Sequence, residues 1–137
     1  MSDNRFNKEL TQKLVDTILE LQALQSLDSF ALAGGTNLAL RFNHRRSVDI
    51  DLFSNMVVGL EGLALIKSEL EQRYNGNLIH CEIIDPEAGE QYCFLRAFIN
   101  KDVDFTVKVE VIQNIALLDQ VETVDKIRCS PKRILDF

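Results

Sequence analysis

The hydrophobic and polar positions divide the chain into an early alternation of helices with strands and a later run of strands. Apolar residues recur at spacings of three and four over residues 5–27, which predicts an amphipathic helix. The same kind of pattern predicts a second long helix over residues 59–74, which Asn75-Gly76 ends. The residues from Val48 to Leu52 alternate strictly between apolar and acidic side chains and predict a strand. Further strands are expected over residues 29–33, 77–85, 91–99, 103–112 and 121–129.

Short segments between these elements predict the connections. The polar run Asn100-Lys101-Asp102 is typical of the turn of a β-hairpin between residues 91–99 and 103–112. Residues 36–42 favour a short helix, and Ser130-Pro131 has the capping serine and first-turn proline of a helix start. Because helices alternate with strands first and strands follow one another later, we expect an α/β or α+β fold with a mixed sheet.

Composition narrows the class of protein. At 137 residues the chain has the length of one domain. Its formal net charge of -6 argues against broad, non-specific binding of nucleic acid, which needs a cationic surface. It has neither an apolar run of the roughly 20 residues that span a membrane nor the layout of a signal peptide. Three cysteines without close pairing indicate a reducing compartment, so we expect a cytoplasmic protein without membrane contact.

Two aspartates within the predicted strand are the first candidates for chemistry. Because strand side chains alternate, Asp49 and Asp51 should share one face while Ile50 faces the core. Close carboxylates repel each other, and a divalent cation such as Mg²⁺ removes that repulsion. Paired carboxylates of this kind serve phosphoryl and nucleotidyl transfer. The alternative is that they form the solvated face of an edge strand.

The residues before this strand are candidates for binding phosphate. Gly34 and Gly35 let the backbone approach a ligand closely, and Thr36 follows at the start of the short helix. A helix N-terminus offers unpaired N–H groups to a phosphate. A plain tight turn at the two glycines is the alternative.

A third carboxylate is available on the strand TVKVEVI. Lys108 and Glu110 share one face of that strand. Glu110 would complete the set of metal ligands, or it would be the base that accepts a proton from the attacking hydroxyl. Lys108 would meet a triphosphate, or it would be a cross-strand partner in an ion pair.

The run GGTNLALRFNHRRSVDIDLFS resembles the AbiEii/AbiGii toxin family of nucleotidyltransferases, within the DNA polymerase beta-like nucleotidyltransferase superfamily. The matching residues are Gly34, Gly35, Thr36, His44, Arg45, Ser47, Asp49, Asp51, Leu52 and Phe53. The second family motif, Lys-x-Asp, is matched by Lys108-Val109-Glu110, with glutamate in place of aspartate.

The resemblance implies a nucleotidyltransferase fold, a mixed β-sheet flanked by helices. It implies Mg²⁺-dependent transfer of a nucleotide from a nucleoside triphosphate onto RNA, such as tRNA, or onto protein. Such proteins act as toxins of type IV toxin–antitoxin or phage-defence systems, beside a separately encoded antitoxin. The implied catalytic and metal-binding residues are Asp49, Asp51 and Glu110. The implied substrate-binding residues are Gly34, Gly35, Thr36, Arg45, Ser47 and Lys108.

Some of these assignments have alternatives. Arg45 would brace the Asp-x-Asp strand instead of contacting substrate, and Ser47 would orient an aspartate. We expect residues 1–137 to form a single nucleotidyltransferase-like domain without the helical region that follows in the family. That expectation and the presence of Glu110 motivate a second hypothesis, a catalytically reduced module with the same fold that binds nucleotide or a partner.

Overall fold

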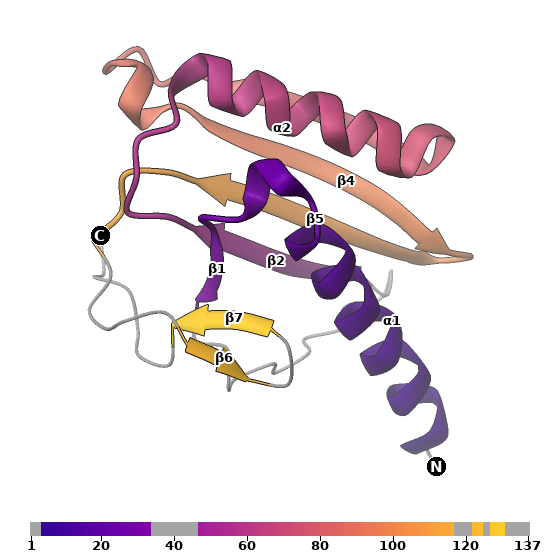
Figure 1. Ribbon diagram of the computed structural model, residues 1–137. Coiled ribbons are helices and arrows are strands. Elements are labelled where there is room, and N and C mark those ends of the chain that lie inside the picture. The colour runs from indigo at the N-terminus through magenta and orange to yellow at the C-terminus, as the bar shows by residue number, and fades with distance from the viewer. Residues whose placement is uncertain (1–3, 34–46, 117–121, 125–126, 131–137) are drawn as a thin grey trace.

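The computed structural model describes residues 4–33, 47–116, 122–124 and 127–130. These residues form a seven-stranded sheet in the order β3-β4-β5-β2-β1-β7-β6 (Figure 1). The strands are β1 (Ala31–Ala33), β2 (Ser47–Phe53), β3 (Leu78–Ile84), β4 (Phe94–Asp102), β5 (Phe105–Ile112), β6 (Glu122–Val124) and β7 (Ile127–Ser130). The helices are α1 (Asn4–Gln22) and α2 (Gly59–Tyr74), with 3-10 turns η1 (Gln25–Leu27), η2 (Asn75–Asn77) and η3 (Glu90–Tyr92). β2 runs parallel to β5, and β1 runs parallel to β7, whereas the other neighbouring strands are antiparallel. The predicted mixed sheet flanked by helices is confirmed.

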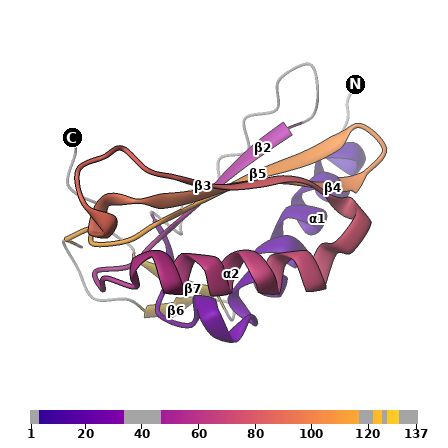
Figure 2. The same cartoon turned by 90° about the horizontal axis from the view of Figure 1, so that it is seen from above.

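Both helices pack against the same face of the sheet, as Figure 2 shows from above. Alternate residues of β4 and β5 are buried toward the helices, because strand side chains alternate between faces. The largest side chains of this core include Phe30, Phe105, Ile18, Leu21, Ile50 and Leu63. Among the described residues, no helix covers the opposite side of β2, β4 and β5, which we call the open face.

The first helix is shorter than its apolar pattern predicts. α1 ends at Gln22, and Leu24 has an extended backbone with φ -72° and ψ 132°. The chain then turns into η1, where the backbone N–H and hydroxyl of Ser26 both donate to Glu69 of α2. These contacts with a distant helix, rather than local helix propensity, decide where α1 stops.

The predicted hairpin exists, but its turn lies two residues further along the chain. Asn100, Lys101 and Asp102 continue β4, and the turn is formed by Val103 and Asp104. Asp104 has a φ of 61°, and the Asp102 carboxylate accepts a hydrogen bond from the N–H of Val103. An acidic residue tolerates this left-handed conformation better than most residues do.

Of the remaining predicted elements, most agree with the structure or lie outside the described residues, and one is divided in two. α2 has the predicted bounds, and β3 lies within the predicted 77–85 strand. The strand expected over residues 121–129 is instead two short antiparallel strands, β6 and β7. The helix expected over residues 36–42 and the helix expected from Pro131 onward lie outside the described residues. No described helix has the length and apolar character to cross a membrane.

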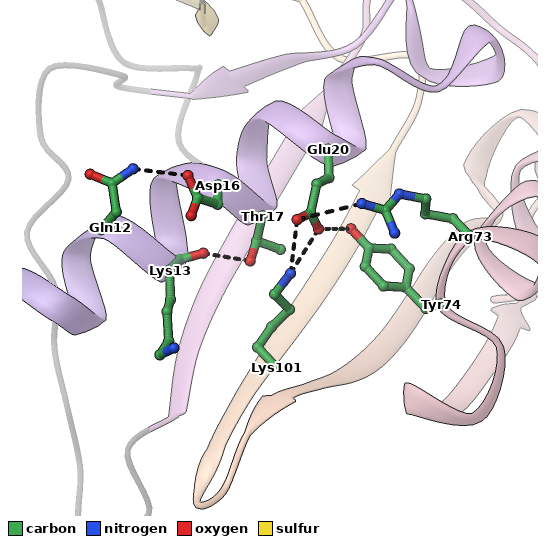
Figure 3. A network of polar contacts seen from close by, with 8 residues as sticks. All are labelled: Gln12, Lys13, Asp16, Thr17, Glu20, Arg73, Tyr74 and Lys101. Carbon is green, nitrogen blue, oxygen red and sulfur yellow. Dashed lines mark hydrogen bonds and ion pairs between the residues drawn. The ribbon is translucent and has the colours of Figure 1, made fainter.

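A polar network holds α1, α2 and β4 together (Figure 3). The Lys101 amine lies 2.8 Å from Oε1 and 3.0 Å from Oε2 of Glu20, and the Tyr74 hydroxyl donates to the same carboxylate. The side chain of Lys101 is only 17% exposed, so it depends on Glu20 for compensation of its charge. Burial and the neighbouring Glu20 carboxylate raise the pKa of the Tyr74 hydroxyl, which therefore remains a donor.

Replacing Glu20 with alanine is expected to lower the free energy of unfolding by about 2 kcal/mol, because it leaves a largely buried ammonium without a partner. Urea denaturation would measure the change. Asp16→Ala on the same helix is the control, since its carboxylate is exposed and, among the described residues, accepts a hydrogen bond from Gln12 one turn away. Equal stabilities of the two variants would contradict the assigned role of Glu20.

Candidate active site

Two strands bring the predicted acidic residues to the open face. β2 is buried through Val48, Ile50 and Leu52, so its aspartates must point away from the helices. The parallel register of β2 and β5 places Asp49 opposite Lys108 and Asp51 opposite Glu110. The register thus brings side by side the two faces that strand alternation predicted separately, one with Asp49 and Asp51 and the other with Lys108 and Glu110.

Asp51 lies in an unfavourable electrostatic environment. Burial, then the Glu110 carboxylate, then Asp49 raise the pKa of Asp51, and among the described residues Lys108 acts in the opposite direction. Lys108 is closer to the other aspartate, with its amine 3.8 Å from Asp49 Oδ2. The charge repulsion expected for an Asp-x-Asp strand is thus present at its second carboxylate.

Glu110 has a cationic partner from the next strand. The Arg96 Nε–H donates to Glu110 Oε2 at 2.8 Å, and the two residues are directly opposite each other in the β4–β5 ladder. The Glu110 side chain is only 18% exposed, so this ion pair is shielded from water more than a surface pair is. Arg96 therefore offsets part of the charge of Glu110, yet the Glu110 carboxylate still raises the pKa of Asp51.

The donor chemistry of this surface fits a hard divalent cation. Carboxylate oxygens are the ligands that Mg²⁺ prefers, and a bound cation would relieve the repulsion that raises the pKa of Asp51. Asp49 and Asp51 are the residues that would hold it. Within the described ranges, no three acidic, histidine or cysteine side chains converge closely enough to hold a metal ion by themselves. The contact between Arg96 and Glu110 is made by Oε2, so Glu110 would join such a site through Oε1 or by changing that contact.

The predicted phosphate-binding residues are mostly beyond the described part of the chain. Gly34, Gly35, Thr36 and Arg45 lie outside it, and Ser47 is placed by its backbone alone, opposite Thr106. β1 ends at Ala33, one residue after the Leu32–Leu52 pair. The glycines therefore follow directly after a strand that borders Asp51's own strand.

Arg96 is the site residue that the sequence interpretation missed. It lies between Leu95 and Ala97, both buried, so the alternation of β4 places it on the open face. The signal was a single charged residue in the middle of the apolar run FLRAFI. Its pairing with Glu110 depends on the register of the hairpin. The turn predicted at residues 100–102 implies a different register, so it does not indicate this pair.

Comparison with known proteins identifies the family. Residues 18–123 match the family described as "Nucleotidyl transferase AbiEii toxin, Type IV TA system". The chain belongs to the AbiEii family. The matched region contains β1, β2, β4 and β5, and with them Asp49, Asp51, Lys108 and Glu110. The resemblance inferred from the glycine and aspartate motifs is confirmed.

Similarity outside the AbiEii family is distant. No curated protein has a significantly similar sequence. A solved structure titled "structure of GLD-2/RNP-8 complex" contains a chain that is 18% identical and superposes with a TM-score of 0.47 over 76% of this chain. This AbiEii chain spans 37% of that chain's length.

Proposed function

We propose that this AbiEii chain is a Mg²⁺-dependent nucleotidyltransferase that moves a nucleotide from a nucleoside triphosphate onto RNA, such as tRNA, or onto protein. The observation that carries the proposal is the pair Asp49 and Asp51 on an open sheet face, where the pKa of Asp51 is raised. Among the described residues, the cation that pairs with these aspartates is Lys108, whose amine lies 3.8 Å from Asp49 Oδ2. The family match supports the same reaction class.

Each side chain of the surface has a role in this proposal. Asp49 and Asp51 hold Mg²⁺, which supplies charge neutralisation at the transferred phosphate when bound. Glu110 is either a third ligand or the base that takes the proton of the attacking hydroxyl. The acceptor oxygen bonds to the α-phosphorus, the bond to the bridging oxygen breaks, and pyrophosphate leaves. Gly34, Gly35, Thr36, Arg45, Ser47 and Lys108 are proposed to hold the triphosphate.

Arg96 adds a cation close to the same surface. Its guanidinium is fixed by Glu110 and lies 5.8 Å from the centre of the Phe94 ring. An arginine so held keeps its planar fork oriented, which suits phosphate oxygens better than a mobile lysine does. We propose that Arg96 moves from Glu110 toward phosphate when the carboxylate turns to the metal.

In the cell, the proposed role is that of a toxin of a type IV toxin–antitoxin or phage-defence system, acting in the cytoplasm and countered by a separately encoded antitoxin. The family description supports this context. We further propose that residues 1–137 form a single nucleotidyltransferase-like domain.

A second function is favoured by the ion pair between Arg96 and Glu110. If that pair persists in the presence of Mg²⁺ and nucleotide, Oε2 of Glu110 stays bound to Arg96 and the third carboxylate is hindered in its proposed role. The chain would then be a catalytically reduced module that binds nucleotide or a partner with the same fold.

The first experiment is a transfer assay. The chain is mixed with Mg²⁺, each of the four labelled nucleoside triphosphates in turn, and total tRNA or cell protein. We expect label to move to one acceptor class with the native chain and not with Asp49→Ala/Asp51→Ala. Asp16→Ala/Asp28→Ala is the control, because both of these aspartates are exposed and neither belongs to β2 or β5.

The outcomes separate the two functions. Transfer that survives loss of both β2 aspartates would exclude the proposed site. A folded native chain that binds nucleotide but transfers none would exclude the transferase and leave the binding module.

A further inference from the structure

A pocket lies at the end of β5, next to the proposed site. Its volume is about 570 Å³, within the range of roughly 300–1,000 Å³ that is typical of small-molecule sites. Its lining includes Tyr92, Phe94, Arg96, Glu110, Ile112 and Asn114. Because Arg96 and Glu110 form part of its wall, the pocket is continuous with the open face that carries Asp51.

The pocket presents flat aromatic and cationic surfaces. Tyr92, in η3, is 53% exposed, which is a high value for a large aromatic side chain. In the same lining, the Arg96 guanidinium lies over the Phe94 ring, with 5.8 Å between Arg96 Cζ and the ring centroid. Aromatic rings and guanidinium planes are the surfaces on which planar heteroaromatic rings stack.

The two amide side chains of the pocket differ in whether a ligand can form hydrogen bonds with them. Gln113 is 3% exposed and its amide is fully bonded to four backbone groups, so it positions the wall and is not free for a ligand. The next residue, Asn114, is exposed, and its backbone is held by a hydrogen bond from its N–H to the Met56 carbonyl. An exposed amide on a fixed backbone offers one donor and one acceptor, the pattern that reads the edge of a nucleobase.

We propose that this pocket binds a nucleobase, stacked on Tyr92 and contacted at its edge by Asn114. The inference rests on the proposed function, because it gives that reaction a place for one of its bases. A base in the pocket lies beside Glu110, so its ribose and phosphate extend along β5 toward Asp51 and Asp49. The base belongs either to the nucleoside triphosphate or to the acceptor nucleotide.

The test uses ligand-observed NMR, which needs no turnover. ATP, CTP, GTP and UTP are each added with Mg²⁺, and saturation transfer to base and ribose protons is recorded with the native chain and variants. Tyr92→Ala is expected to weaken binding of the preferred nucleotide roughly 5- to 100-fold and to remove the base signals. Tyr92→Phe keeps the ring and should bind normally. Val103→Ala is the control, since Val103 is 79% exposed in the distant β4–β5 turn.

Comparing the binding of nucleoside triphosphates with the binding of tRNA distinguishes the two possible sources of the base. If Tyr92→Ala leaves binding of all four triphosphates unchanged but weakens binding of total tRNA by the same factor, the pocket holds the acceptor base. If Tyr92→Ala changes neither, or if Val103→Ala changes either equally, the inference is overturned. Base binding without transfer would overturn the proposed function alone, and transfer that is indifferent to Tyr92 would overturn the pocket alone.

A second variant tests the contact at the base edge. Asn114 has a φ of 61°, a conformation that aspartate also tolerates, so Asn114→Asp replaces the amide donor without straining the backbone. Losing the donor should change the order of preference among the four bases by about tenfold, the usual scale of one such contact. An unchanged order of preference would exclude Asn114 from the base edge.

Discussion

Replacing Asp51 with asparagine is expected to lower nucleotide transfer roughly 10²- to 10⁴-fold and, in the absence of Mg²⁺, to make the fold more stable. The loss of activity follows from removing one of the two carboxylates proposed to hold the metal, since single groups of this kind contribute on the order of 10²–10⁴ in rate. The gain in stability follows from the raised pKa of Asp51, whose charged form is opposed by burial, Glu110 and Asp49. One substitution thus moves the two properties in opposite directions.

The gain in stability should depend on pH in a defined way. The carboxyl of the unfolded chain ionises around its ordinary pKa of 3.8, whereas the folded protein holds that proton to higher pH. The native chain therefore loses stability relative to the Asp51→Asn variant as the pH rises above 3.8. The difference in stability between the two proteins reaches its full size above the raised pKa of Asp51. Below 3.8 both proteins are uncharged at this position and the difference should vanish.

Thermal unfolding over a pH series, with and without Mg²⁺, would measure this effect. Asp104→Asn is the matched control, because Asp104 is exposed in the β4–β5 turn and asparagine tolerates its φ of 61°. Mg²⁺ should raise the Tm of the native chain more than that of Asp51→Asn. A variant that is both inactive and less stable at neutral pH would show that Asp51 supports the fold and would contradict its assignment as a strained metal ligand.

Replacing Gln113 with alanine is expected to lower the free energy of unfolding by roughly 3 to 5 kcal/mol, the largest effect on stability of a single polar residue described here. Gln113 Oε1 accepts hydrogen bonds from the backbone N–H groups of Val58 and Gly59. Its Nε2 donates to the carbonyls of Glu90 and Cys93. One buried amide therefore joins the end of β5 to the start of α2 and to η3.

The size of the effect comes from the groups that are left behind. Alanine removes the partner of four backbone groups at a position that is 3% exposed, and a buried polar group without a partner costs about 1–3 kcal/mol. Gln113→Glu is informative as well, since it keeps the acceptor for Val58 and Gly59 but sets a carboxylate against two carbonyl oxygens. It should also destabilise the fold.

Urea denaturation would compare both variants with Gln72→Ala. Gln72 is an exposed glutamine of α2, so its loss should change stability by no more than about 0.5 kcal/mol. A Gln113→Ala protein within 1 kcal/mol of the native chain would mean that water replaces the amide at this junction.

The sequence by itself determined much of the fold, because its strongest patterns are local. Strict alternation defined β2 and showed that Asp49 and Asp51 share a face, and the apolar period of α2 gave that helix its bounds. The glycine and Asp-x-Asp motifs were specific enough to indicate the AbiEii family, which the match over residues 18–123 confirmed. These features need only the residue order and the geometry of a single strand or helix.

The exact ends of two elements could not be read in this way. α1 stops at Gln22 because Ser26 binds Glu69 of α2. The Asn-Lys-Asp run continues β4 because Lys101 reaches Glu20 of α1. In both places a contact between residues far apart in the sequence overrides a local preference.

In the candidate site, too, some features followed from the local sequence and others only from the tertiary structure. The acidic residues of β2 and β5 were predicted from alternation, but their order across the sheet was set by the parallel register, which pairs Asp51 with Glu110. A turn two residues earlier would have given Glu110 a partner other than Arg96, so the ion pair that controls Glu110 was not predictable. Only the folded sheet fixed the register of β2, β5 and β4. That register decided that Arg96 pairs with Glu110 and that Asp51 lies beside the Glu110 carboxylate.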